Sequence, residues 1–126
     1  MDGIQGVLID FLLAFSRLDL GGMMACFEDD ATSFFPISHH IVMLDGKDEI
    51  REAFEKVLSK IRATGHRSIK LEPKDVKIQD FGDTAIVTFH IRDADLSRRT
   101  LVLRRKEDKW LIQHLHASNA PLGEAR

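Results

Sequence analysis

The hydrophobic period of this chain changes once, after Gly65, and that change restricts the folds that the chain can adopt. Before Gly65, apolar residues recur three and four positions apart, which is the spacing of one face of a helix. After Gly65 they recur at every second position, which is the spacing of one face of a strand. Helices followed by a run of adjacent strands predict an α+β domain, with N-terminal helices packed on one face of a mostly antiparallel sheet.

Three helices are predicted in the first half of the chain. The apolar stripe of the first is formed by Ile4, Val7, Leu8, Phe11, Leu12 and Phe15. Asp19 is a suitable N-cap for a short second helix through "LGGMMACF". The third runs over residues 46–65, with Asp45 as its N-cap and Gly65 as its C-terminal stop.

Six strands are expected around and after these helices. Two short ones lie in "SFFP", where Pro36 ends the strand, and in "HHIVMLDG". Four longer strands are predicted near residues 68–79, 83–93, 98–106 and 109–118, because "DFGD" and "KED" between them are typical of turns.

Length and charge limit the classes of function. At 126 residues the chain has the length of one domain, so residues 1–126 are predicted to form a single domain. A formal net charge of −2 gives no attraction to nucleic acid or to an anionic membrane. The apolar N-terminal stretch contains Asp10 and follows no Lys or Arg, so neither a signal peptide nor a spanning helix is predicted. The single cysteine, Cys26, excludes an internal disulfide and suits the reducing cytoplasm.

Alternation along the last three strands assigns their two faces. The odd-numbered residues are the more apolar, so we expect them to face the helices. They are Ala85, Val87, Phe89, Ile91, Leu101, Leu103, Leu111, Leu115 and Ala117. The outer face is then expected to carry Thr88, His90, Trp110, Ile112, His114 and His116.

The ending "KWLIQHLHASNAP" raises the question of what His114 and His116 do, and three interpretations are open. As metal ligands they need a further donor, which His90 or the pair His39 and His40 would supply. As catalytic bases they would face away from the space between sheet and helices. As structural residues they would pack against a second subunit, together with the rest of the outer face. The sequence favours the third interpretation, and we predict no metal and no cofactor.

The segments "FEDDAT", "LDGKDEIREAF" and "RRTLVLRRKEDKWLIQHLHASNAP" resemble the nuclear-transport-factor-2-like superfamily. This is the cystatin-like cone, a curved sheet covered by helices, also found in ketosteroid isomerase, scytalone dehydratase and the SnoaL-like proteins. The ending is most similar to the association (hub) domain of calmodulin-dependent protein kinase II. The resemblance implies a homodimer, or a ring of dimers, formed through the outer sheet face. It also implies a pocket between the inner face and the helices.

Compared with those relatives, the pocket of this chain has lost its charged groups. The isomerases keep a base carboxylate just before the proline that ends the first strand, where this chain has Phe35. They also use a tyrosine as an oxyanion donor, and this chain contains no tyrosine. The inner arginines of hub domains align with Ile91, Leu101 and Ala117. We therefore expect no proton carrier on the inner face, and no support for the acid–base chemistry of those enzymes.

A mainly apolar pocket is the resulting prediction. Its expected lining is Met23, Phe34, Phe35, Phe89, Ile91, Leu101, Gln113, Leu115 and Ala117. The same residue types at these spacings also form ordinary protein cores, so a pocket filled by its own side chains stays open as an alternative.

Three functions follow from this reading of the sequence. The preferred one is a homodimeric domain that binds a small apolar molecule in the cone. The second is an isomerase, dehydratase or hydrolase acting on a polyketide- or steroid-like substrate, with Asp45 or His40 at the pocket mouth. The third is an oligomeric assembly domain that resembles a kinase hub.

Overall fold

The computed structural model describes residues 3–36, 42–92 and 95–121 and confirms the α+β class. The helices are α1 (Gly3–Ser16), α2 (Leu20–Met24) and α3 (Lys47–Ala63). The strands are β1 (Phe27–Phe34), β2 (Leu44–Asp45), β3 (Lys74–Asp80), β4 (Thr84–Arg92), β5 (Asp95–Lys106) and β6 (Lys109–Pro121). Among the described residues, no helix has both the length and the apolar composition needed to span a membrane.

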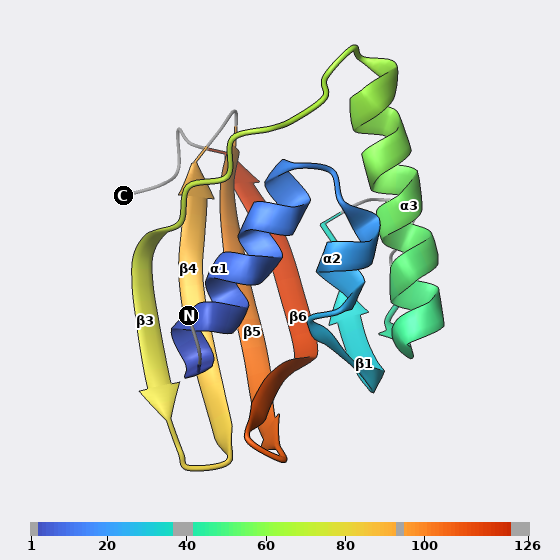
Figure 1. Ribbon diagram of the computed structural model, residues 1–126. Coiled ribbons are helices and arrows are strands. Elements are labelled where there is room, and N and C mark those ends of the chain that lie inside the picture. The colour runs from blue at the N-terminus through green and yellow to red at the C-terminus, as the bar shows by residue number, and fades with distance from the viewer. Residues whose placement is uncertain (1–2, 37–41, 93–94, 122–126) are drawn as a thin grey trace.

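One six-stranded sheet with the order β2-β1-β6-β5-β4-β3 forms the body of the molecule. Its neighbouring strands are antiparallel except for β1 and β6, which run parallel. The helices lie on one face of this curved sheet, as predicted (Figure 1). We call this the inner face and the opposite one the outer face.

The ends of the helices follow local chemistry, with one correction. Oδ1 of Asp19 accepts a hydrogen bond from the backbone N–H of Gly22 at 3.0 Å, which confirms the predicted cap of α2. The N-cap of α3 is Gly46 and not Asp45, because the chain turns into the helix with a φ of +97°. Gly65, with a φ of +90°, follows the C-cap Thr64 and ends the helix as expected.

Strand pairing begins later than predicted on β3 and earlier on β1. Residues 66–73 form no strand and lead from α3 across to β3 (Figure 1). Pro73 has no N–H to offer a ladder, so pairing starts only at Lys74. The backbone N–H of Ile69 instead donates to the carbonyl of Ser16 at 2.9 Å. We call the end of the molecule where this linker, the end of α1 and the end of β4 lie the linker end.

A bulge in β6 changes which of its residues face the helices. On β5, Val102 lies opposite His114 but the next residue, Leu103, lies opposite Ile112, so Gln113 is an extra residue. Before this bulge the even-numbered residues face inward. The prediction that Ile112 and Trp110 lie on the outer face is therefore wrong: Ile112 is fully buried and Trp110 packs against the core.

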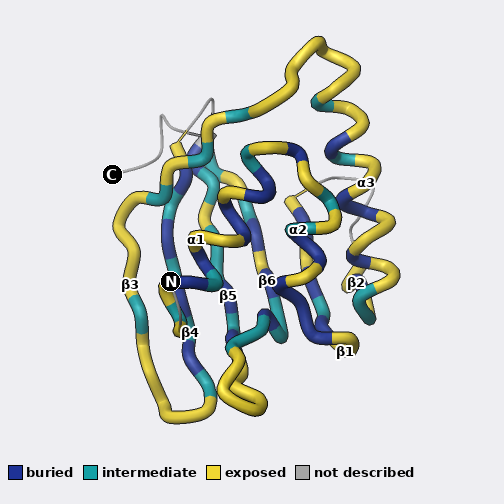
Figure 2. Tube along the Cα trace, viewed as in Figure 1, coloured by how far each residue is buried: buried dark blue, intermediate teal, exposed yellow. Residues whose placement is uncertain are grey.

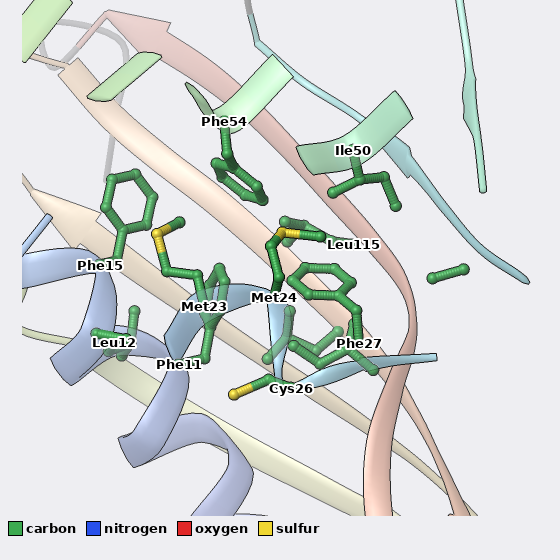
Figure 3. Close-up of a cluster of buried hydrophobic side chains, with 14 of the residues drawn as sticks. Phe11, Leu12, Phe15, Met23, Met24, Cys26, Phe27, Ile50, Phe54 and Leu115 are labelled. Carbon is green, nitrogen blue, oxygen red and sulfur yellow. The ribbon is translucent and has the colours of Figure 1, made fainter. Parts of the chain in front are cut away.

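The core lies between the inner face and the helices, and it is rich in phenylalanine. Buried residues run along α1 and the central strands, whereas β3 is almost entirely exposed (Figure 2). Met23 and Met24 lie among the rings of Phe11, Phe15 and Phe27 (Figure 3). Rings from three elements meet edge to face there: the Phe11 and Phe27 centroids are 5.7 Å apart, and Phe15 is 5.7 Å from Phe54.

Candidate functional site

Most of the residues that were predicted to line a pocket are buried in the hydrophobic core. Seven of the nine residues are buried, with at most 9% of their surface exposed: Met23, Phe35, Phe89, Ile91, Leu101, Leu115 and Ala117. Phe35 packs on Phe54 with 4.6 Å between ring centroids, at the position where relatives are expected to carry a carboxylate. These side chains fill the space in which a ligand pocket was expected.

The other two predicted pocket residues lie outside the core. Phe34 is 37% exposed on the outer face, where its ring centroid is 5.3 Å from that of His116. It follows Ser33 on β1, and a residue next to an inward-facing one must face outward. Gln113, the bulged residue, donates from Nε2 to Oδ1 of Asp30 at 3.2 Å and accepts from Arg104 at 3.5 Å. Both assignments to the pocket were wrong.

A charged residue that the sequence analysis did not single out, Arg99, lies on the inner face. On β5 it lies opposite Phe89 of β4 and Ala117 of β6, both of which are buried under the helices. The expectation of an inner face without charged groups is therefore wrong. The signal was present, because continuing the alternation of Leu101 and Leu103 two residues back reaches Arg99.

The surroundings of Arg99 are unusual for a cation. Its guanidinium carbon is 5.7 Å from the ring centroid of Phe15, and its Nε donates to Oγ of Ser97 at 3.1 Å. Desolvation lowers the pKa of Arg99 from 12.5 to about 10, so the group stays charged at neutral pH. No carboxylate of residues 3–36, 42–92 and 96–120 forms an ion pair with it, in contrast to Arg105, which is 2.8 Å from Asp83.

Two hollows flank the linker, and although Arg99 lines neither of them, each contacts a residue beside it in the fold. One, of about 600 Å³, lies between the end of α3, the linker and the end of β4, with Ile61, Ile69 and Ile91 on its wall. The other, of about 480 Å³, is lined by Ser16, Arg17 and residues 68–71. Both border neighbours of Arg99, because Ile91 is diagonal to it across β4 and Ser16 follows Phe15 on α1.

A third hollow, of about 400 Å³, lies between α1, α2 and the start of β6 and includes Cys26. The thiol of this buried residue is 3.6 Å from the carbonyl oxygen of Gly22. Burial, reinforced by the negative charge of Asp10, raises the pKa of Cys26 to about 11. The sulfur is therefore a neutral thiol at pH 7, which is the form that does not act as a nucleophile.

The predicted outer-face histidines do lie on the outer face. His114 and His116 lie opposite Val102 and Thr100, and His90 lies opposite Arg98 on the same side of the sheet as Thr88. No three side chains of the metal-ligating types come together in the described part of the chain. His39 and His40 fall outside the described residues, whereas Asp45 is exposed on the edge strand β2.

The sequence matches the model of a protein family described as the SnoaL-like domain over residues 4–123. The chain belongs to this family. The resemblance to the nuclear-transport-factor-2-like proteins is thereby confirmed. The SnoaL-like domain matches no curated protein closely enough to indicate a relative.

Solved structures share the fold of this SnoaL-like domain and confirm the cystatin-like cone. A protein from Caulobacter vibrioides with a cystatin-like fold superposes with a TM-score of 0.81, at 16% identity over 96% of this chain and 89% of its own. A protein from Thiobacillus denitrificans, provisionally named a calcium/calmodulin-dependent protein kinase type II association domain, gives 0.76 at 22% identity over 95% and 97%. A ketosteroid isomerase-like protein from Erwinia carotovora atroseptica gives 0.73 at 22% identity over 94% and 95%.

Proposed function

We propose that this SnoaL-like domain binds a small organic acid with an apolar body at the linker end of the sheet. The observation that carries the proposal is Arg99, a desolvated cation on the inner face without an anionic partner among residues 3–36, 42–92 and 96–120. The sequence alone predicts an apolar ligand. Arg99 changes that expectation to a ligand that also carries a negative charge.

A desolvated charge is costly unless something compensates for it, and a carboxylate is the natural partner of a guanidinium. The planar fork of Arg99 is suited to two parallel hydrogen bonds with the two oxygens of an acid. The neighbouring side chains Phe15 and Ile91 would contact the apolar part of such a ligand. The hollow of about 600 Å³ beside Ile91 lies within the range of about 300–1,000 Å³ typical of small-molecule sites.

Binding without chemistry is better supported than an isomerase, dehydratase or hydrolase activity. Acid–base catalysis needs a side chain that exchanges a proton near pH 7. The strand residues around Arg99 on the inner face are Phe89, Ser97, Leu101 and Ala117, and their side chains cannot do so. Of the two residues that the enzyme hypothesis named, Asp45 is on the far edge strand and His40 is outside the described residues.

The proposal retains the homodimer, with the outer face as its interface. This face mixes partly buried apolar side chains, Ile86 and Val102, with Thr88, His114 and the exposed Phe34. Such a mixture of apolar and hydrogen-bonding groups is typical of subunit interfaces. Trp110 and Ile112 are excluded from the interface because they pack on the inner side.

Calorimetric titration with hexanoate tests the proposed ligand class, because hexanoate joins a carboxylate to a short apolar chain. We expect saturable binding to the parent protein and weak or no binding of hexanol, which lacks the charge. Arg99→Gln should weaken hexanoate binding about tenfold or more, since a hydrogen bond to a charged group contributes roughly 1.5–3 kcal/mol.

Arg104→Gln is the matched control, because Arg104 also belongs to β5, faces the other side of the sheet and lines neither hollow. It should leave hexanoate binding unchanged. Equal affinities of the parent and Arg99→Gln would overturn the proposal, as would equal binding of hexanol and hexanoate.

A further inference from the structure

The outer face contains a hollow of its own at the linker end, with a volume of about 350 Å³. Its wall includes Asp75 of β3, His90 of β4, Arg98 of β5, and His116 and Ser118 of β6. The register explains this gathering: His90 lies opposite Arg98, and Arg98 lies opposite Ser118. One row across three strands thus places an imidazole, a guanidinium and a hydroxyl side by side.

The backbone of β3 is distorted where it supplies Asp75. The pairing of β3 with β4 is irregular between Lys74 and Lys77, and Asp75 within that interval has a φ of +56°. A bulge commonly redirects a side chain, and a non-glycine residue rarely adopts this left-handed backbone. Here the distortion brings Oδ2 of Asp75 to 2.9 Å from Nδ1 of His90. The bond fixes the orientation of the ring and leaves Nε2 of His90 for another partner.

The guanidinium of Arg98 is available to bind an anion at this place. Its Nε donates to the neutral Oγ of Ser118 at 3.2 Å, and no carboxylate of residues 3–36, 42–92 and 96–120 pairs with its guanidinium. Some other surface cations are paired, such as Arg105 with Asp83 at 2.8 Å and Lys74 with Glu72 at 2.9 Å. The hollow therefore has several hydrogen-bond donors and a cation, and its one acidic group, Asp75, is held by His90.

We propose that this outer hollow is a binding site for a tetrahedral oxyanion, the group shared by free phosphate and a phosphate monoester. It extends to the edge strand β3, so it lies at the border of the outer face that forms the proposed dimer interface. Arg98 supplies the charge, His90 and His116 supply ring nitrogens, and Ser118 and Thr100 supply hydroxyls. An oxyanion with several acceptor oxygens matches this set of donors from three strands. Arg99 also borders this hollow, but its side chain extends from the opposite face of β5 to that of Arg98, so the two proposed sites use different guanidinium groups.

Titration of the protein with inorganic phosphate near pH 7, at constant ionic strength and monitored by calorimetry, tests this site. We expect saturable binding that Arg98→Gln and His90→Gln each weaken by about tenfold. Arg104→Gln is the control on the same face of the same strand, because Arg104 contacts Gln113 outside the hollow, and it should bind phosphate like the parent. Circular dichroism and urea unfolding of each variant establish that the fold is retained.

A parallel titration with glycerol 3-phosphate distinguishes the two sources of the oxyanion. Tighter binding of the ester than of free phosphate identifies a phosphorylated small molecule, and equal or weaker binding identifies the free ion. The proposal is overturned if phosphate does not saturate the parent at millimolar concentrations. It is also overturned if folded Arg98→Gln binds as the parent does, or if Arg104→Gln weakens binding equally. The phosphate titration contains no organic acid, so its result does not depend on the organic-acid proposal.

Discussion

Thr32 and His114 lie opposite each other on the parallel strands β1 and β6, with Oγ1 of the threonine 2.8 Å from Nδ1 of the histidine. Burial of the ring, and then the neighbouring His116, lower the pKa of His114, and the contact with Thr32 opposes this only in part. The folded protein therefore holds this imidazole neutral in a pH range where an exposed histidine would take up a proton.

Acidification should destabilise the fold through His114. The pKa of His114 is lower in the folded than in the unfolded chain. Its contribution to stability is therefore complete above about pH 6.5, the ordinary pKa of histidine. That contribution is lost as the pH falls from there through the folded pKa, because the unfolded chain takes up the proton first. Urea unfolding at pH 7.5 and 5.5 measures the loss, which should be smaller in His114→Gln. An identical loss in both proteins would show that other groups cause it.

Replacement of Arg99 by methionine should leave the ligand-free protein as stable as the parent or make it more stable. The substitution removes a charge whose pKa the fold lowers to about 10. The relief is partly offset by the loss of the contact with Phe15, so we expect a gain of up to about 1 kcal/mol in the free energy of unfolding. Urea unfolding in a buffer without organic acids measures it, with Arg98→Met as the control. A clear loss of stability would assign Arg99 a structural role instead.

The two adjacent glycines of α2 should respond to alanine in opposite ways. A Cβ on Gly22 would lie 2.5 Å from Oδ2 of Asp19 and 3.0 Å from Cβ of Ala14, so Gly22→Ala displaces the side chain that caps the helix. We expect a cost of about 1–2 kcal/mol. A Cβ on Gly21 meets Asp19 at an ordinary 3.7 Å, so Gly21→Ala should gain up to about 1 kcal/mol from helix propensity. Thermal unfolding of the pair provides the comparison, and equal shifts would contradict the capping argument.

Phe35→Glu should destabilise the protein at pH 7 and recover in part at pH 5. Phe35 is only 9% exposed and packs on Phe54, so a carboxylate there would be desolvated and its pKa raised. A group with a raised folded pKa loses stability as the pH rises, and the cost at pH 7 should reach several kcal/mol. Phe35→Leu should cost only about 1 kcal/mol as a packing defect. If Phe35→Glu melts like the parent at pH 7, the new carboxylate is either hydrated or paired with a cation. The enzyme hypothesis then becomes the stronger one.

Light scattering at micromolar concentration should give the mass of a dimer, and Phe34→Glu should reduce it to that of a monomer. Phe34 is exposed on the outer face beside His116, so a charge there would be buried in the interface. Phe81→Glu is the control, because Phe81 is 64% exposed at the turn between β3 and β4 and does not belong to the strands that form that face. A monomer mass for the parent protein would end the dimer proposal.

The order of the elements was accessible from the sequence because each depends on local spacing. Asp19 and Gly65 bound their helices for reasons that act within a few residues. Pairing across the sheet is non-local, so the face on which each strand residue lies was predicted correctly only in part. It placed Trp110 and Ile112 by unbroken alternation, which one extra residue in β6 interrupts.

The candidate site was missed for a different physical reason. Charged residues are expected in water, so a pair of arginines such as that in "SRRT" on β5 does not suggest an inner-face position, although one of the two must face inward. Alternation alone could have identified Arg99. The outer hollow could not have been found this way, since the contact between Asp75 and His90 depends on a backbone distortion that leaves no periodic trace.

The extra residue in β6 also has a consequence for the comparison of relatives. Because Gln113 shifts the phase of the strand, residues before it and after it obey opposite rules of polarity. In a homologue without this residue, the apolar and polar positions on one side of that point must be exchanged relative to those of this chain. An alignment drawn without a gap at position 113 would therefore match residues of one protein's interior with residues of the other's surface. Substitutions in the two halves of β6 are best compared as if they belonged to two separate strands.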